Sequence, residues 1–160
     1  MEFSTPDLSD AFPEVKALLP IMENYGGKSS FFGPIQTLKC PDDNSLIKEQ
    51  LNSEGNNQVL IVDAEGVNTV ALLGDLIAEA GMRNNWSGIV VNGYIRDVDI
   101  IKTLDIGVQA LGTYPIKSEK RGLGELGIEI CFGGLTFRPG QYIYADNNGL
   151  LLSEIELNSS

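Results

Sequence analysis

The sequence predicts a mixed α/β domain with a parallel sheet in the middle of the chain and antiparallel strands in its last third. The first observation is that three short apolar runs, at residues 59–62, 88–91 and 107–111, alternate with segments of helical spacing. The second is that the chain after Gly122 places closely spaced turn dipeptides between short β-rich segments. A length of 160 residues fits one domain, which we assign to residues 1–160.

The first third of the chain is expected to contain a helix, a strand and a second helix. The TPD segment at residues 5–7 is typical of a helix start, and apolar residues follow at helical spacing up to a predicted end at Pro20. The aromatic and β-branched content of residues 31–40 predicts a strand, bent where glycine and proline follow each other. Residues 45–51 are predicted to form a short helix.

The middle of the chain alternates strands and helices. The run at residues 59–62 is apolar throughout, as expected of a strand that is buried on both faces. A predicted helix at 73–83 leads to the second run, and a short helical crossover at 99–104 leads to the third. This order indicates parallel βαβ pairing.

The last third is predicted to be largely antiparallel. Short strands are expected within residues 127–132, 135–145 and 149–154, broken by the tight turns GG, PG and NNG.

Composition excludes several classes of function. The chain has no histidine, so a Ser-His-Asp triad, a Cys-His dyad and an HExxH zinc site are all excluded, and any metal must bind to carboxylates, carbonyls or water. A formal charge of -11, from 22 acidic and 11 basic residues, disfavours direct binding of nucleic acid. No apolar run approaches the roughly 20 residues of a membrane span, and the acidic N-terminus does not resemble a signal peptide. We therefore expect a cytoplasmic protein with no membrane partner.

The expected cytoplasmic location predicts the redox state of the two cysteines. Cys40 and Cys131 are expected to be reduced thiols and small core residues, and a disulfide between them is the less favoured alternative.

Two loops of the predicted sheet carry the candidate functional residues. Gly74 and Asp75 stand at the start of a predicted helix, where the first backbone amides have no acceptor within the helix. Arg96 and Asp97 follow the next buried strand, at the edge of an α/β sheet where ligands collect. Amides, a guanidinium and two carboxylates in one cleft would suit an anionic, oxygen-rich substrate bound with a hard metal ion.

Each of these residues also has a purely structural interpretation. Asp75 could serve only as the N-cap of its helix, a position that aspartate favours. Arg96 and Asp97 could form only a surface ion pair, which contributes under about 1 kcal/mol.

The spacing of these residues resembles a known motif. Twenty residues separate Asp75 from the pair Arg96 and Asp97. This DX20RD pattern is similar to that of the RraA-like family, which includes class II 4-hydroxy-4-methyl-2-oxoglutarate aldolases and the regulator of ribonuclease activity A. The segments VLIVDAEG, VVNGYIRDVD, GLGELGIEI and IYADNNGLLLSE also resemble the family, from about Asn24 to Glu154.

The resemblance implies a fold, an assembly and a set of roles. The fold would be a compact α/β/β sandwich of the swivelling phosphohistidine-domain type, assembled as a homotrimer or a dimer of trimers. Arg96 would bind the keto and carboxylate oxygens of a small 2-oxo acid, Asp97 would bind Mg²⁺ or Mn²⁺, and Asp75 would hold a water for proton transfer. The substrate carboxylate would be held by the amides of the loop that contains Gly74, Asp75, Leu76 and Ile77.

Two functions are compatible with this resemblance. The first is a carbon–carbon lyase that cleaves 4-hydroxy-4-methyl-2-oxoglutarate to pyruvate, with oxaloacetate decarboxylase side activity through the same pyruvate enolate. The second is a regulator that binds and inhibits ribonuclease E without being an enzyme. The chain departs from the family in that many relatives carry an acid three residues after the Asp of the RD pair, where this chain has Ile100, one position beyond Asp99.

Two further groups of charged residues are weaker candidates. Lys117, Lys120 and Arg121 form a basic cluster that we interpret as a solvated loop. Glu125 is a candidate for a subunit contact or a carboxylate at the rim of the site.

Overall fold

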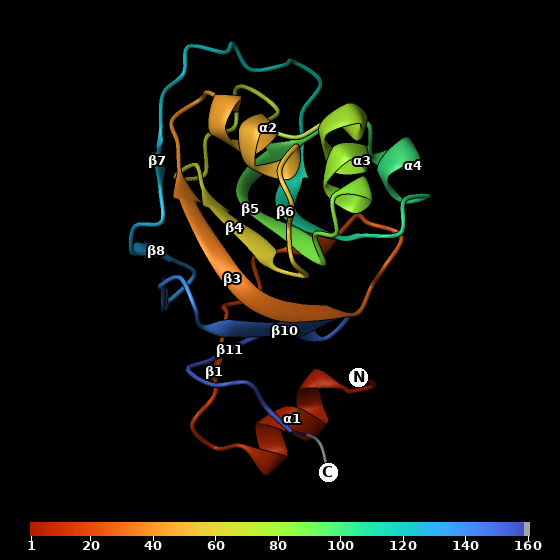
Figure 1. The fold of residues 1–160 in the computed structure, drawn as a ribbon, viewed down its shortest axis with the longest axis vertical. Helices are drawn as coiled ribbons and strands as arrows, with labels where there is room; N and C mark the ends of the chain where they lie inside the picture. Colours follow the sequence, from red (N-terminus) through yellow and green to blue (C-terminus); the bar gives the residue numbers. More distant parts are fainter. Residues whose placement is uncertain (159–160) are drawn as a thin grey trace.

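The computed structural model describes residues 1–158, and in these residues a large mixed sheet carries helices on its outer faces (Figure 1). The helices are α1 (Thr5–Ala11), α2 (Ser45–Leu51), α3 (Asp75–Arg83) and α4 (Val98–Ile101). The strands are β1 (Lys16–Ala17), β2 (Glu23–Asn24), β3 (Phe31–Lys39), β4 (Val59–Asp63), β5 (Gly88–Ile95), β6 (Gly107–Thr113), β7 (Glu125–Leu126), β8 (Ile130–Phe132), β9 (Leu135–Phe137), β10 (Tyr142–Asp146) and β11 (Gly149–Ser153).

The sheet has a parallel half and an antiparallel half, as the sequence predicts. Its strand order is β1-β11-β10-β3-β4-β5-β6-β2, with β7 paired to the end of β3. Strands β3, β4, β5 and β6 are mutually parallel, whereas β1, β10, β11 and β2 pair antiparallel with their neighbours. Strands β8 and β9 form a separate hairpin.

Strand β3 joins the two halves. Residues 31–34 pair with β10, and residues 35–39 pair with β4. Figure 1 shows this long, curved strand passing from the level of β10 up to the parallel strands. The predicted strand is confirmed, and its bend lets the two halves of the sheet face each other.

Two apolar layers result from this arrangement. One face of the parallel strands packs against α2, α3 and α4, through residues such as Leu60, Val91 and Ile47. The other face packs, through residues such as Ile61, against β8 to β11. The order of layers is helices, parallel strands, antiparallel strands, so the predicted α/β/β arrangement is confirmed.

Phe31 packs where the two layers meet. Its ring lies on Gly88 and Gly107, at the first positions of β5 and β6, and a Cβ at either glycine would overlap the ring. These two glycines therefore create the space that the Phe31 ring occupies.

The first helix is shorter than predicted. It ends at Ala11 rather than at Pro20, and Phe12 adopts φ -127° and ψ 85°. The reason is Pro13, because a residue that precedes proline is disfavoured in the helical region. The chain then continues as β1 along β11, and Leu18 enters the core between the sheet layers.

The NNG turn near the C-terminus holds the N-terminal helix in place. The buried carboxylate of Asp146 accepts hydrogen bonds from Thr5 N at 2.8 Å, from Thr5 Oγ1 at 2.7 Å and from Asn148 N at 2.8 Å. Leu8 of α1 packs on Tyr144 at the outer face of the antiparallel strands. The chain start is thereby attached to its end.

The remaining predictions of local structure are confirmed in kind but differ in their bounds. The strand predicted within 127–132 begins only at Ile130, and the PG turn divides residues 135–145 between β9 and β10. The helix predicted at 99–104 is α4, which ends at Ile101 and continues as turns. Strand β5 runs to Ile95, four residues beyond the apolar run, because its end pairs with β6 after a register shift. None of the helices in residues 1–158 has the length and apolar character that crossing a membrane requires.

Both cysteines are free thiols in different environments. Cys40 is buried in the core beside the helices, as predicted, and burial raises the pKa of its thiol to about 12. The prediction that Cys131 is a core residue is wrong. Cys131 is exposed because it is the middle residue of β8, whose two neighbours along the strand point inward.

The Phe31 contact with Gly107 predicts non-additive stability effects. Gly107→Ala should lower the free energy of unfolding by about 1–3 kcal/mol, because the added methyl group displaces the ring. In Phe31→Leu the ring is absent, so the same Gly107→Ala change should cost less. Urea denaturation of wild type, both single variants and the double variant measures this; additive losses would contradict the packing described.

The thiol environments predict selective alkylation. Iodoacetamide at neutral pH should modify Cys131 rapidly and Cys40 only on unfolding, because the thiolate is the reactive form and Cys40 is both buried and protonated. Peptide mass spectrometry reads the two sites separately. Cys131→Ser is the control and should remove the rapid phase; rapid labelling of Cys40 in the native protein would contradict the prediction.

Candidate active site

The candidate residues meet because a short segment before α3 runs beside the end of β5. Leu72 N donates to Tyr94 O at 2.8 Å, and Arg96 N donates to Leu73 O at 2.9 Å. These bonds extend the parallel pairing beyond β4, so the loop at Gly74 emerges next to the loop that follows β5. Asp75 and Asp97, 22 positions apart in the sequence, are thereby placed in contact.

The start of α3 decides between the interpretations of Asp75. Gly74 is the N-cap, and the first intrahelical bond runs from Ala78 N to Gly74 O at 3.1 Å. The N-cap interpretation of Asp75 is therefore wrong, since Asp75 is the first helical residue. Its amide donates to Asp97 Oδ2 at 3.1 Å.

The next two amides of α3 belong to Leu76 and Ile77. Neither has an acceptor four residues back within the helix, and the side chain of Leu76 is exposed. This end of α3 also carries the positive end of the helix dipole. The amides are therefore suited to hold a carboxylate.

Gly74 makes room for the pair that follows β5. A Cβ at Gly74 would lie 2.7 Å from Asp97 Oδ2 and 3.7 Å from Arg96 Nε, so a larger residue would displace the Asp97 carboxylate. Asp97 itself has φ 61°, in the left-handed region that residues with a Cβ rarely adopt. Such strained positions cluster at functional sites.

The ion pair between Arg96 and Asp97 is loose. The distance from Arg96 Nε to Asp97 Oδ2 is 3.9 Å, and the two side chains are 38% and 35% exposed. Arg96 Nη1 also donates to Pro115 O at 3.3 Å. A solvent-exposed pair of this kind contributes under about 1 kcal/mol to stability, so stability alone does not explain the arrangement.

One cleft of about 380 Å³ brings together the residues of the two candidate loops. The six that the sequence predicts line it together: Gly74, Asp75, Leu76, Ile77, Arg96 and Asp97. Other lining residues were not assigned to the site from the sequence: Asn44, Lys48, Glu79 and Arg83, from α2 with its N-cap and from α3, were missed, and Lys117 and Lys120 were interpreted as part of a solvated loop.

Asn44 is the most informative of the missed residues. Its Nδ2 donates to Leu72 O at 3.2 Å, and its Oδ1 is buried without a hydrogen-bond partner among residues 1–158. A buried acceptor without a partner is costly, which points to a polar ligand or water at this wall of the cleft. Its sequence context, DDNS before a short helix, resembles an ordinary turn and carries no distinguishing signal.

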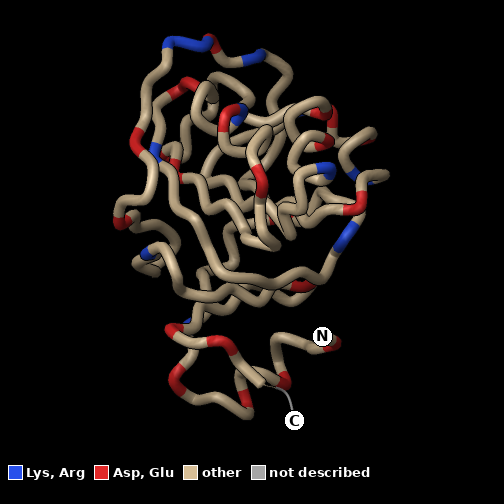
Figure 2. The backbone as a smooth tube through the Cα atoms, viewed as in Figure 1, with Lys and Arg blue, Asp and Glu red and all other residues tan. Residues whose placement is uncertain are grey.

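The cleft is locally basic in a strongly acidic chain. Five of the eleven Lys and Arg residues line it, against three acidic residues. Figure 2 shows basic positions along the segment between β6 and β7, whereas acidic positions gather around α1. The local charge favours an anionic ligand at the cleft.

The weaker candidates lie in different places. Lys117 and Lys120 are exposed, as predicted, but they also line the cleft, whereas Arg121 pairs with Asp42 outside it. Glu125 lines a second cavity of about 600 Å³ with Lys39 and Glu65.

A metal ion at this site would depend on few protein ligands. Within residues 1–158, no three His, Cys, Asp or Glu side chains come together as a ligand cluster. Asp97 offers a partly exposed carboxylate held in position by the Asp75 amide. One or two carboxylates, completed by water and substrate oxygens, are the usual protein contribution to a Mg²⁺ site, so the residues present fit this ion.

Comparison with known proteins identifies relatives named as aldolases and a relative named as an inhibitor of RNA processing. A protein of Azotobacter vinelandii (strain DJ), provisionally named a 4-hydroxy-4-methyl-2-oxoglutarate aldolase, is 54% identical over 96% of this chain and 95% of its own length. The structure of the RNA-processing inhibitor RraA from Thermus thermophilis matches with a TM-score of 0.95 and 38% identity, over 99% of this chain and 97% of that one.

A third relative carries yet another name. A structure described as an S-adenosylmethionine: 2-dimethylmenaquinone methyltransferase from Geobacillus kaustophilus matches with a TM-score of 0.94 and 39% identity, over 97% of each chain. The RraA-like family model, described as Aldolase/RraA, matches residues 5–152. With this match over nearly its whole length, the chain belongs to the RraA-like family.

Proposed function

We propose that this protein is a divalent-metal-dependent lyase that cleaves 4-hydroxy-4-methyl-2-oxoglutarate into two molecules of pyruvate. The observation that carries the proposal is the convergence of Arg96, Asp97 and the first amides of α3 on one basic cleft. The provisional aldolase name of a relative with 54% identity supports the same substrate. Oxaloacetate decarboxylation follows as a side activity, because it passes through the same enolate.

Substrate binding is assigned to groups that suit carboxylate and keto oxygens. The amides of Leu76 and Ile77 would receive the carboxylate next to the keto group. Arg96 would hold the keto oxygen and one carboxylate oxygen, because its planar fork of donors fits two oxygens better than a lysine does. Asp97 would hold Mg²⁺ or Mn²⁺, which supplies a Lewis acid for the charge that develops on the keto oxygen.

Asp75 is assigned to proton transfer. Its carboxylate would hold a water that takes the proton from the 4-hydroxyl group. The bond between C3 and C4 then breaks, the C4 fragment leaves as pyruvate, and the bonding electrons remain on the other fragment as an enolate. Protonation of the enolate at its methylene carbon by the same water gives the second pyruvate.

The lyase proposal predicts a specific loss of activity at Asp97. Pyruvate release from 4-hydroxy-4-methyl-2-oxoglutarate and from oxaloacetate, followed with lactate dehydrogenase, should require Mg²⁺ or Mn²⁺ and stop with EDTA. Asp97→Ala should lower kcat/KM by about 10²-fold or more, as expected when charge stabilisation is removed from a developing oxyanion.

Asp105→Ala is the matched control. Asp105 is an exposed aspartate in the turn that follows α4, outside the cleft, and its substitution should leave kcat/KM unchanged. If wild type and Asp97→Ala are equally inert with added Mg²⁺ or Mn²⁺, the lyase proposal fails for these substrates.

We infer a second candidate function from the relative that inhibits RNA processing. The chain is 38% identical to that RraA protein, and its acidic residues gather around α1 (Figure 2). An acidic surface suits a basic protein segment and repels RNA itself, so the partner would be ribonuclease E rather than its substrate. A homotrimer, or a dimer of trimers, is the assembly that we propose for either function.

The regulator proposal predicts salt-sensitive binding to a protein. Pull-down of purified ribonuclease E should succeed at low salt and weaken markedly at 0.5 M NaCl, where the Debye length falls to about 4–5 Å. Asp7→Asn together with Asp10→Asn should weaken capture, because both belong to the acidic surface at α1. Capture that neither salt nor these substitutions affect would contradict this surface as the binding site.

A further inference from the structure

One wall of the cleft is formed by a segment without regular structure. Residues 114–124, between β6 and β7, include Lys117 and Lys120. At its start Ala71 N donates to Ile116 O at 2.6 Å, and at its end β7 pairs with the last residues of β3. The part between these two attachments is mostly exposed.

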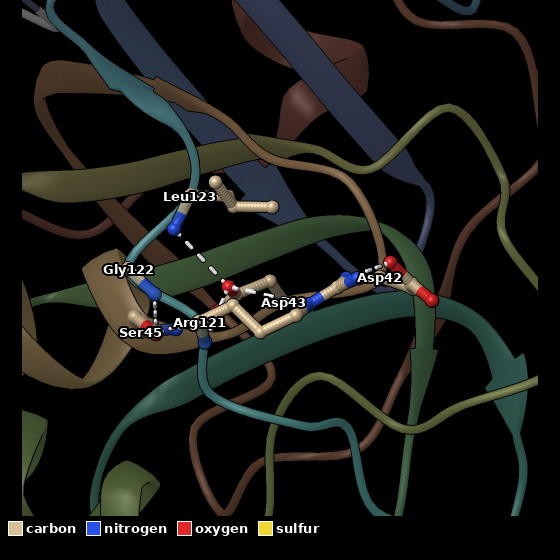
Figure 3. Close-up of polar contacts among 6 residues, drawn as sticks. All are labelled: Asp42, Asp43, Ser45, Arg121, Gly122 and Leu123. Atoms are coloured by element: carbon tan, nitrogen blue, oxygen red, sulfur yellow. Dashed lines mark hydrogen bonds and ion pairs between the residues drawn. The ribbon is translucent and has the colours of Figure 1, made fainter.

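A buried carboxylate holds the part of this segment that lies next to β7. Asp43 Oδ2 accepts from Arg121 N at 2.7 Å and from Leu123 N at 3.1 Å (Figure 3). Its Oδ1 accepts from Ser45 N at 2.8 Å and from Ser45 Oγ at 2.5 Å. Ser45 Oγ in turn accepts from Gly122 N at 3.0 Å.

These contacts give Asp43 an unusual electrostatic environment. The side chain is completely buried, and Arg121 Nε lies 4.0 Å from Oδ2. Burial alone would raise the pKa of this carboxyl group, but the hydrogen bonds from Ser45, Leu123 and Arg121 lower it to about 2. Asp43 is therefore charged at neutral pH and binds three consecutive residues of the segment directly or through Ser45.

The same turn also contributes Asn44 to the lining of the cleft. Asn44, next to Asp43, binds Leu72 O and leaves its buried Oδ1 facing no protein partner within residues 1–158. The turn at 43–45 thus connects the loop before α3 with the segment that contains Lys117 and Lys120.

We propose that Asp43 is a positioning residue of the cleft, which holds residues 119–124 so that the segment, attached to Ala71 at its other end, keeps Lys117 and Lys120 beside the bound anion. The inference rests on the proposed function, because it assigns the two lysines to the part of the substrate that is not held by Arg96. Asp43 itself does not line the cleft and touches no substrate. Its effect is on how the lysines are held.

Asp43→Asn tests this role with two independent measurements. The substitution preserves the shape of the side chain but places an amide against backbone donors, so hydrogen exchange should accelerate in residues 119–124 and remain unchanged in α3. The KM for oxaloacetate should rise by about tenfold with kcat within about twofold, the pattern expected when binding is lost equally from the ground state and the transition state.

Asp42→Asn is the matched control. Asp42 pairs with the exposed guanidinium of Arg121 but does not bind the backbone of the segment, so exchange and KM should stay near wild type. Lys117→Ala combined with Lys120→Ala should raise KM to the level of Asp43→Asn, and adding Asp43→Asn to this double variant should raise it no further. Should Asp43→Asn fail to fold, Ser45→Ala removes the Gly122 contact and provides the same readouts.

The outcomes separate this proposal from the lyase proposal. Faster exchange in residues 119–124 with an unchanged KM would overturn the positioning role while the lyase stands. If wild type releases no pyruvate, calorimetric binding of 2-oxoglutarate, a 2-oxo acid with a second, distal carboxylate, replaces KM, and weaker binding by Asp43→Asn than by Asp42→Asn would support the positioning role alone. A wild-type chain that neither cleaves oxaloacetate nor binds 2-oxoglutarate contradicts both proposals.

Discussion

Strand β3 is the constraint on which the rest of this structure depends. Its first four residues belong to the antiparallel half of the sheet and its last five to the parallel half. Because one continuous strand joins the halves, the second half folds over the first and buries an apolar layer between them. Phe31, at the beginning of β3, fills the space that Gly88 and Gly107 leave free. The parallel strands are thereby covered on both faces, which is the condition under which parallel sheets are stable.

Parallel pairing also determines where chemistry can occur. The strands of the parallel half end at the same edge, and the pairing of residues 72–73 with the end of β5 continues this alignment into the loops. Arg96, Asp97 and the start of α3 consequently face one cleft. The left-handed backbone of Asp97 and the absence of a side chain at Gly74 let the Asp97 carboxylate lie beside the start of α3.

The cleft combines rigid and irregular elements. Helix α3 supplies the amides and the residue that follows strand β5 supplies the guanidinium, whereas the segment at 114–124, which has no regular structure of its own, supplies lysines. A buried, charged aspartate that satisfies several backbone donors can stabilise such a segment where a neutral hydrogen bond would be weaker. Asp43 has this role in the structure, and it links the segment to the turn that contributes Asn44 to the cleft.

The sequence by itself determined the elements whose information is local. Apolar runs predict the parallel strands because burial on both faces requires apolar residues at every position, and the GG, PG and NNG turns predict the hairpins because their backbone angles favour glycine. Asp75, Arg96 and Asp97 were identified as candidates because they follow strands of this kind and reproduce a spaced family motif. Apolar spacing predicts a helix up to Pro20, but the helix ends at Ala11 because Phe12 precedes a proline and is disfavoured in the helical region.

Only the tertiary structure decided which distant residues complete the cleft. Asn44, Lys117 and Lys120 join Arg96 there. Asp43 binds the backbone of Arg121 and Leu123, which follow it by 78 and 80 positions in the chain. No periodicity or motif encodes these contacts, because they depend on the order of strands in the sheet and on the path of a connection without regular structure. Local sequence specifies which residues can form an element, whereas contacts of this range exist only after the elements have packed together.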